Sequence, residues 1–391
     1  MSAGSGEGLR CMLMRGGTSK GAYFLAEDLP ADPAARDELL LRVMGSPDPR
    51  QIDGLGGAHP LTSKVAVVSR SADDEADVDY LFLQVGVDRP EVTDRQNCGN
   101  LLAGVGPFAV ERGLVVAKGE SASVRIRMVN SGDHATATFP TADGRVVYEG
   151  TTEISGVPGT AAPVTIGFGR GSGPLLPTGR VRDVIADVPV TCVDNGMPTV
   201  LIAAAALGVT GYEEPGDLEE NVTLNERLHE LRLAAGRLMG LGDVSATTVP
   251  KLSLLAPPAH GGAVMTRTFI PVRCHTAIGV LGAASVAAGL RIPGGVGEGV
   301  ASLPAQDDAP LRIEHPTGFL DVDTEVSIAP AAGAGTRAGA GTGVAAAADG
   351  PAPVALRTGV VRTARKIFDG TVFPRPATPP ATAPHTDRSS R

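Results

Sequence analysis

Several features that define common protein classes are scarce in this 391-residue chain. It has no tryptophan, and aromatic residues make up only 3% of the sequence, which leaves few side chains for stacking on nucleobases. The net charge of −9 also argues against a nucleic-acid partner. No apolar run is long enough to span a membrane, and the N-terminus lacks a signal-peptide pattern. We therefore expect a cytoplasmic protein that binds neither nucleic acid nor membrane.

Metal and hydrolase signatures are also missing. The seven histidines are scattered, with no paired ligand spacing, and no Gly-x-Ser-x-Gly elbow occurs. The four cysteines contain no Cys-x-x-Cys pair, so in a reducing compartment they are expected to be free thiols. We expect no metal and no cofactor.

The most informative stretch runs from Asp94 to Gly113. Cys98 stands at the start of an apolar segment with helical spacing, and Asn97 is the expected N-cap. The N-terminus of a helix carries partial positive charge, which favours a thiolate and attracts carboxylates. This pattern indicates a reactive Cys98 beside an anion site. Pro107 lies inside the predicted helix, where we expect a kink.

A second stretch repeats this pattern. Cys274 precedes a segment of small and apolar residues, and both Cys98–Gly113 and Cys274–Gly289 span 15 positions. The repeat predicts two related halves, each with a buried central helix whose N-terminus carries chemistry. For Cys274, a small buried residue at a helix start is as good an interpretation as a reactive thiol.

The expected organisation follows from this repeat and from the composition of the remaining segments. We expect one domain over 1–180, another over 181–373 with a mobile Ala/Gly-rich insertion over 329–350, and a disordered tail over 374–391. Apolar spacing predicts peripheral helices over 33–44 and 225–239.

Two segments of the first half offer cations. The turn Arg15–Gly21 combines a flexible backbone with two hydroxyls and two cations, which suits capture of a carboxylate or phosphate. An ordinary glycine-rich turn fits that pattern equally well. Lys64 stands at the head of the apolar strand Val65–Val68. A partly buried lysine can act as a base, although a solvent-exposed strand-edge lysine is the commoner case.

The second half contains comparable positions. Asn195–Gly196 favours a tight turn between two strands, and backbone amides of such a turn can bind a carboxylate. Lys251 heads another apolar strand, while Arg273 and His275 flank Cys274. A thiol, a candidate lysine base and anion-binding turns together suit proton abstraction next to a carboxylate or carbonyl.

These motifs resemble those of the PrpF family. The matching segments are Arg15–Gly21, Thr62–Ala66, Asn97–Asn100, Asp194–Pro198 and Arg362–Lys366. The resemblance implies an α+β fold of two similar domains, each a mixed β-sheet wrapped around a central helix, as in diaminopimelate epimerase. It also implies that the site lies in the cleft.

The segments 11–17, 271–276 and 314–318 are most similar to the 4-oxalomesaconate tautomerase branch. That similarity implies a cofactor-independent isomerase of an unsaturated tricarboxylate, with keto–enol tautomerisation of 4-oxalomesaconate in gallate degradation as the expected reaction. The alternatives are a 2-methylaconitate cis–trans isomerase of the methylcitrate cycle and a non-catalytic accessory protein of an aconitase-like dehydratase. A homodimer is the default expectation.

The resemblance assigns catalysis to Lys64 and Cys98 and leaves open which is the base and which the acid. An amino-acid epimerase fits less well, because it needs a second thiol across the cleft. The expected substrate-binding residues are Arg15, Gly17, Thr18, Ser19, Lys20, Asn97, Gly99, Asn100, Asn195, Gly196, Met197, Lys251, Arg273, Cys274 and His275.

Overall fold

A computed structural model describes residues 8–95, 98–168, 173–271, 273–306, 309–328 and 352–377. The predicted insertion at 329–350 lies outside these ranges, as does the predicted tail from residue 378 onward. The chain divides into two compact units. Unit 1 consists of Met1–Val116, Ile126–Asp133 and Arg365–Arg391, and unit 2 consists of Ala117–Arg125 and His134–Ala364. The domain boundary expected at residue 180 stays a prediction.

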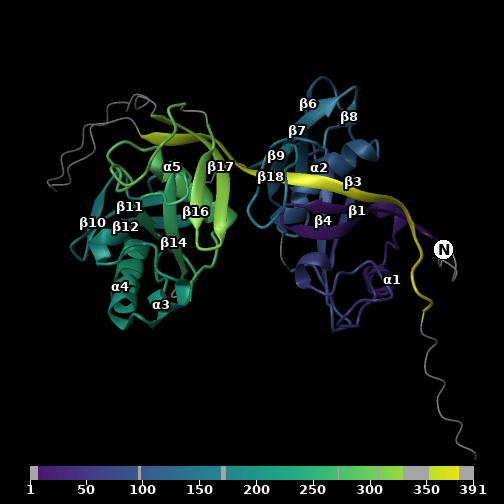
Figure 1. Cartoon of the computed structure of the whole chain (residues 1–391), viewed down its shortest axis with the longest axis horizontal. Coiled ribbons are helices and arrows are strands. Elements are labelled where there is room, and N and C mark those ends of the chain that lie inside the picture. The colour runs from purple at the N-terminus through teal and green to yellow at the C-terminus, as the bar shows by residue number, and fades with distance from the viewer. Residues whose placement is uncertain are drawn as a thin grey trace, which may run out of the picture. The chain divides into compact units, whose positions relative to one another are not determined.

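Unit 1 contains a mixed sheet (Figure 1). Its strands are β1 (Leu9–Gly16), β2 (Ser19–Leu25), β3 (Lys64–Arg70), β4 (Val78–Val85), β5 (Val92–Thr93) and the end of β6 (Ser121–Met128). β1 and β2 form an antiparallel hairpin, β3 lies parallel to β2, and β4 lies antiparallel to β3. β5 then pairs antiparallel, and β6 parallel, with β4.

The connection from β2 to β3 carries α1 (Pro33–Met44), which has the predicted bounds. The Asp32 side chain accepts a hydrogen bond from the Ala35 amide at 2.9 Å, and Pro33 occupies the first turn, where its missing N–H costs nothing. Gly45 ends the helix in the left-handed conformation with φ +79°. The buried side of α1 consists of Leu39, Leu40, Val43 and Met44.

The central helix of unit 1 is α2 (Gly99–Glu111), which packs against β1, β2, β3 and β4. Its N-cap is Cys98, so the expected N-cap at Asn97 was wrong by one residue. The reason is that Cys98 keeps an extended backbone (φ −129°, ψ 95°), and its carbonyl accepts the first helical bond, from Leu102, at 3.1 Å. Asn97 itself lies outside the described residues.

The helix α2 runs without interruption through Pro107, and the expected kink there stays a prediction. One turn before Pro107, Gly104 allows close packing of α2 against β2. A Cβ on Gly104 would lie 2.4 Å from Tyr23 Oη, and this hydroxyl donates to the Leu101 carbonyl at 2.6 Å. Glycine at 104 therefore allows the β2 tyrosine to lie directly on the helix backbone.

Unit 2 is built from a larger mixed sheet. Its strands are β7 (His134–Ala142), β8 (Arg145–Val146), β9 (Pro163–Phe168), β10 (Asp183–Ile185), β11 (Val188–Asp194), β12 (Pro198–Ala203), β13 (Lys251–Ala256), β14 (Val264–Ile270), β15 (Arg273–Cys274), β16 (Leu311–His315), β17 (Gly318–Ile328) and most of β18 (Pro353–Val372). Its helices are α3 (Pro215–Glu220), α4 (Val222–Leu238) and α5 (Val280–Leu290). Short 3-10 turns lie at Ala26–Asp28 and Pro60–Thr62 in unit 1 and at Ala204–Leu207 in unit 2.

The pairing order of unit 2 repeats that of unit 1. β11 and β12 form an antiparallel hairpin, β13 lies parallel to β12 after a helical connection, and β14 lies antiparallel to β13. β15 then pairs antiparallel, and β16 parallel, with β14, while the central helix α5 lies between them in sequence. The expected α+β architecture, in which a mixed sheet surrounds a central helix twice, is confirmed.

The two helices of unit 2 begin at different places from those expected. Cys274 does not stand at the head of α5, because it belongs to the ladder of β15, opposite Phe269. The helix starts six positions later, after the N-cap Gly279. For α4, the Asn221 side chain accepts from the Leu224 amide at 3.0 Å, which starts the helix three residues before the predicted position 225.

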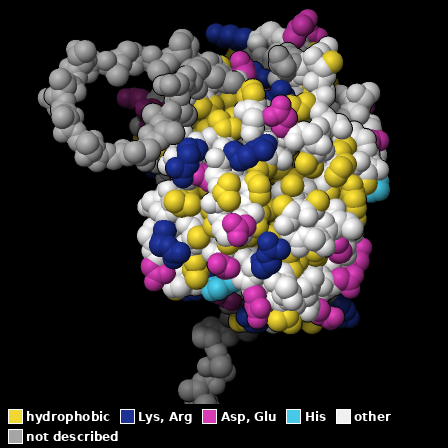
Figure 2. Space-filling view, turned by 90° about the vertical axis from the view of Figure 1, so that its left-hand side faces the viewer, with side chains coloured by type: hydrophobic (Ala, Val, Ile, Leu, Met, Phe, Trp, Pro, Cys, Tyr) yellow, Lys and Arg dark blue, Asp and Glu magenta, His cyan; other side chains and the backbone are white. Residues whose placement is uncertain are grey.

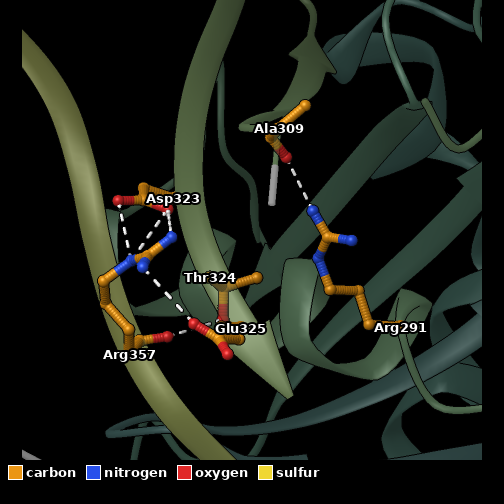
Figure 3. Close-up of polar contacts among 6 residues, drawn as sticks. All are labelled: Arg291, Ala309, Asp323, Thr324, Glu325 and Arg357. Atoms are coloured by element: carbon orange, nitrogen blue, oxygen red, sulfur yellow. Dashed lines mark hydrogen bonds and ion pairs between the residues drawn. The ribbon is translucent and has the colours of Figure 1, made fainter. Parts of the chain in front are cut away.

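The long strands β17 and β18 carry a cross-strand ion pair, which Figure 3 shows in detail. Arg357 on β18 donates to Asp323 on β17 at 2.8 Å and to Glu325 at 3.3 Å. In the same view, Arg291 at the end of α5 donates to the Ala309 carbonyl at 2.6 Å. These contacts tie the central helix and the last strand of unit 2 to their neighbours.

On the face of unit 2 drawn in Figure 2, apolar side chains are interspersed with both acidic and basic ones. Among the helices of the described part of the chain, none is both long and apolar enough to cross a membrane.

Candidate functional site

In unit 1, the N-terminus of α2 holds the β1–β2 turn. Asn100 Nδ2 donates to Thr18 Oγ1 at 3.0 Å and to Ser19 Oγ at 3.4 Å. Gly17 has φ +49°, and a Cβ there would lie 2.4 Å from Asn100 Oδ1. Only glycine fits this turn, because both its backbone conformation and its contact with the helix exclude a side chain. The structure thus brings four predicted residues into one cluster: Gly17, Thr18, Ser19 and Asn100.

The two cations of this turn have different surroundings. Arg15 Nη1 donates to the Gly17 carbonyl at 2.9 Å, which braces the turn from within. Burial, together with the neighbouring Arg365, lowers the pKa of Arg15 from its ordinary value. Lys20 lies beside Gly57, where a Cβ would be 3.4 Å from its Nζ.

Lys64 is buried, with 7% of its surface exposed, so the expectation of a partly buried lysine is met rather than that of a solvent-exposed strand edge. The β3–β4 register places Gln84 opposite Lys64, and Lys64 Nζ donates to Gln84 Oε1 at 2.6 Å. The ammonium also lies 5.0 Å from the centre of the Phe82 ring. Gln84 Nε2 in turn donates to the Ser63 carbonyl at 2.8 Å, which fixes the orientation of the amide. Lys64 is therefore a positioned amine.

Cys98 lies half-buried at the N-cap of α2. Tyr80, on β4, donates its hydroxyl to the Cys98 carbonyl at 3.2 Å. Burial raises the pKa of Tyr80 well above its usual value, and the nearby cysteine adds to this effect, so the phenol stays protonated and remains a donor. Among the described residues, no atom lies within 4 Å of a Cβ placed on Gly99 in the first turn of the helix.

Gly21 on β2 lies close to both β3, which begins at Lys64, and α2, which follows Cys98. A Cβ there would lie 2.7 Å from both the Lys64 carbonyl oxygen and Leu101 Cδ2. The backbone at Lys64 therefore borders the first turn of α2, three residues beyond Cys98. This arrangement places an amine-bearing strand start and a thiol-bearing helix start in the same part of unit 1.

In unit 2, the β11–β12 turn is anchored on the middle of α5. The Asn195 amide donates to Ser285 Oγ at 3.1 Å, and Asn195 Nδ2 donates to the Ala284 carbonyl at 3.2 Å and to Thr358 Oγ1 at 2.8 Å. Ser285 Oγ donates to the Met197 carbonyl at 2.7 Å, and Gly196 adopts φ +90°. The Asn195 amide and side chain are thus both engaged inside the protein, and the Gly196 amide donates to Asp194 Oδ1 at 3.1 Å.

Lys251 begins β13 and is 9% exposed. Burial lowers its pKa from the ordinary value, and the nearby Arg232 lowers it further. Arg232 is itself buried, and its Nη1 donates to the carbonyls of Val244, Thr247 and Val249 at 2.8, 3.2 and 3.2 Å.

The segment after β14 carries the other predicted residues of unit 2. Arg273 is exposed, whereas Cys274 is buried and its amide donates to Glu219 Oε1 at 3.1 Å. Burial raises the pKa of Cys274 to about 11, although Arg267 opposes this rise. His275 Nδ1 accepts from the Ala277 amide at 2.8 Å, and burial and Lys251 together lower the pKa of His275. Cys274 thus lacks the surroundings of a reactive thiol.

Gln84, Tyr80 and His315 were missed by sequence reasoning. The first two act through cross-strand and strand–helix contacts, and no motif in the chain marks them. His315 lies in a matching segment, which was a usable signal, and burial lowers its pKa to about 4. Among the residues that the structure describes, no group of three or more His, Cys, Asp or Glu side chains could hold a metal ion.

The doubled α+β fold, with a mixed sheet around a central helix in each unit, defines the structural class of the protein, and that class includes isomerases. The solved structure of methylitaconate-delta-isomerase has this fold, with a TM-score of 0.76 and 32% identity, covering 94% of this chain and 96% of that one. The chain belongs to the PrpF family, because the family model described as PrpF protein matches residues 8–375.

Two curated relatives are similar over nearly the whole chain. The (4E)-oxalomesaconate Delta-isomerase of Novosphingobium sp. strain KA1 is 54% identical, covering 93% of this chain and 96% of its own. The 4-oxalomesaconate tautomerase of Pseudomonas putida KT2440 is 53% identical, covering 93% of this chain and 95% of its own. The predictions of a PrpF-family protein and of an isomerase are confirmed.

Proposed function

We propose that the chain is a 4-oxalomesaconate tautomerase that acts in gallate degradation. The observation that carries this proposal is the 53–54% identity, over 93% of the chain, to two isomerases named for that substrate. The proposal further includes a cytoplasmic location, a homodimer and a reaction without metal or cofactor.

The proposed chemistry is a proton transfer with no net redox change. One acid–base group removes a proton from the carbon next to the carbonyl, and the C–H electron pair delocalises into the conjugated system. A proton is then returned to the carbonyl oxygen or to the far carbon, so that atoms and charge balance. We assign the two proton-transfer roles to Lys64 and Cys98 and leave open which of them is the base.

Support for this assignment comes from unit 1. Gln84 accepts from Lys64 Nζ at 2.6 Å, Tyr80 donates to the Cys98 carbonyl at 3.2 Å, and no atom of the described residues lies within 4 Å of a Cβ placed on Gly99. Backbone donors at the start of α2 are suited to a developing negative charge. The remaining predicted residues are proposed as binding groups for the carboxylates, namely Arg15, Gly17, Thr18, Ser19, Lys20, Asn97, Gly99, Asn100, Asn195, Gly196, Met197, Lys251, Arg273, Cys274 and His275.

Proton NMR in D2O tests the proposal. Purified protein is mixed with 4-oxalomesaconate and, separately, with 2-methylaconitate, after treatment with a chelator. Deuterium incorporation and isomerisation with the first compound alone are the expected result. Turnover of 2-methylaconitate alone would reassign the substrate, and tight binding without exchange would favour an accessory role.

A further inference from the structure

Phe82 lies in a gap of the unit 1 sheet. On the side of β4 away from β3, β6 pairs with β4 as far as Tyr80, and β5 pairs with it from Gln84 onward. The Tyr80 carbonyl accepts from the Val129 amide on this side at 2.9 Å. Backbone groups of alternate residues point to the same side of a strand. The Phe82 amide and carbonyl therefore face this side too, where the described residues provide no strand to pair with them.

The side chain of Asn130, two residues beyond the end of β6, fills this gap. Asn130 Oδ1 accepts from the Phe82 amide at 2.9 Å, and Asn130 Nδ2 donates to the Phe82 carbonyl at 2.9 Å. A residue of a neighbouring antiparallel strand would make the same pair of bonds. Asn130 Nδ2 also donates to the Asp94 carbonyl at 2.7 Å. One side-chain amide thus joins β4 to the segment that follows β5.

Three residues of β4 contact the proposed catalytic residues. Tyr80 donates to the Cys98 carbonyl at 3.2 Å, the Phe82 ring centre lies 5.0 Å from Lys64 Nζ, and Gln84 accepts from the same Nζ at 2.6 Å. These residues are two positions apart, so their side chains lie on one face of the strand. Phe82 is the middle one, and a shift of its backbone displaces both the ring beside the ammonium and its neighbours in β4.

We propose that Asn130 is a positioning residue of the proton-transfer site in unit 1. Its amide takes the place of a strand at Phe82, and this keeps β4 in the geometry in which Phe82 and Gln84 hold the Lys64 amine. The inference rests on the proposed function and deepens it, because it adds a residue that acts on Lys64 through β4. The groups involved all belong to unit 1.

Steady-state kinetics of two variants with 4-oxalomesaconate test this role. Asn130→Ala removes all three bonds, whereas Asn130→Asp keeps the shape and one acceptor but places an oxygen against two carbonyls. Both variants should lower kcat by about 10- to 100-fold and change KM by no more than about twofold, because a displaced amine is misaligned for proton transfer. Unchanged kcat in both variants overturns the inference, and so does an effect confined to KM.

Asn225→Ala separates positioning from general stability. Asn225 in α4 of unit 2 also donates its side-chain amide to two backbone carbonyls, those of Leu218 and Glu219, at 3.4 and 2.8 Å. Urea unfolding gives the stability of each variant, and we expect Asn225→Ala to be destabilised while its kcat stays at the wild-type value. If kcat falls in proportion to the loss of stability in both Asn130→Ala and Asn225→Ala, the effect is general destabilisation and the inference is wrong.

Hydrogen–deuterium exchange tests the contact without turnover. Peptides that contain Phe82 should exchange about tenfold faster in Asn130→Ala than in the wild type, because the Phe82 amide loses its acceptor. Peptides from β13 in unit 2 should exchange at the same rate in both proteins. Equal exchange of the Phe82 peptides contradicts the role of Asn130 as a partner of β4.

The two proposals fail separately. If the wild type isomerises 4-oxalomesaconate but the Asn130 variants keep their kcat, the positioning role is wrong and the function stands. If the wild type has no isomerase activity, the reaction and the catalytic role of Asn130 are both wrong. Faster exchange in Asn130→Ala then leaves Asn130 as a structural partner of Phe82 only.

Discussion

The hydroxyl of Tyr80 donates a hydrogen bond to the carbonyl oxygen of Cys98 at 3.2 Å. This carbonyl also accepts the first backbone bond of α2, from Leu102, at 3.1 Å. A buried phenol on β4 thus holds the backbone of the residue that carries the proposed thiol.

Removal of that hydroxyl tests its positioning role. We expect Tyr80→Phe to cost about 1–2 kcal/mol of stability, because the buried contact is lost while the ring still packs. Turnover should fall mainly in kcat. Urea unfolding and steady-state kinetics measure both effects, and Tyr212→Phe, which removes a hydroxyl bonded to the Pro257 carbonyl at 2.8 Å, is the control. Equal kcat in both variants would argue against positioning.

The proton-transfer assignment predicts large losses at two positions. Lys64→Met and Cys98→Ser should each lower kcat by roughly 10²–10⁴, the usual contribution of one acid–base group. Gln84→Leu should lower kcat less, because it removes only the acceptor that orients Lys64. Full activity of both Lys64→Met and Cys98→Ser would refute the assignment, and circular dichroism establishes that the variants are folded.

Thiol reactivity should distinguish the four cysteines. Burial raises the pKa of Cys11 and Cys192 to about 12 and that of Cys274 to about 11. These three should remain protonated and unlabelled at pH 8, whereas the half-buried Cys98 should react with iodoacetamide. Mass spectrometry of the labelled peptides reports each site, and urea-unfolded protein, in which all four should react, is the control. Preferential labelling of Cys274 would reverse our interpretation of that residue.

Asn195 and Asn100 should respond differently to truncation. Asn195→Ala removes buried bonds to Ala284 and Thr358, so a loss of about 2–3 kcal/mol in the free energy of unfolding is expected. Asn100→Ala should cost about 1 kcal/mol or less, because its bond to Thr18 is exposed and its bond to Ser19 only part-buried, and should mainly raise KM. Urea titrations and kinetics of both variants test this contrast. A larger stability loss for Asn100→Ala would contradict it.

Stability should fall on the acid side through His315. Burial lowers its pKa from 6.5 to about 4, so the unfolded chain takes up this proton at a higher pH than the folded protein does. The contribution of neutral His315 to the free energy of unfolding is fully present above pH 6.5 and is lost as the pH falls toward 4. The total loss amounts to about 3 kcal/mol. His315→Gln should flatten the decline in unfolding free energy over that range. An unchanged slope would show that other groups cause the decline.

Periodicity was sufficient for elements that end at strong local signals. Asp32, Pro33 and Gly45 mark both ends of α1, and its bounds were predicted correctly. For α5, the run of small apolar residues contains no signal for the start of a helix. Cys274 pairs with Phe269 between β15 and β14, so the helix begins only at Val280. Local sequence cannot supply such a tertiary constraint.

The candidate site was predictable where residues lie on a motif. Lys64, Cys98 and the turn at Thr18 were proposed from such motifs, and in the structure Asn100 donates a hydrogen bond to Thr18 in this turn. Gln84 and Tyr80 were missed because their roles depend on strand register and on packing of β4 against the helix. A glutamine or a tyrosine within an apolar strand forms no sequence motif that would indicate a functional site.

The division of β18 between the units has a consequence for biosynthesis. Unit 1 contains strands that precede unit 2 in the sequence, yet it also uses Arg365 and the residues that follow. Asp369 pairs with Arg112 at 2.7 Å, and Lys366 pairs with Glu111 at 2.8 Å, at the end of α2. Unit 1 therefore gains these contacts with its central helix only after the intervening residues of unit 2 have been translated, so its completion follows the synthesis of unit 2.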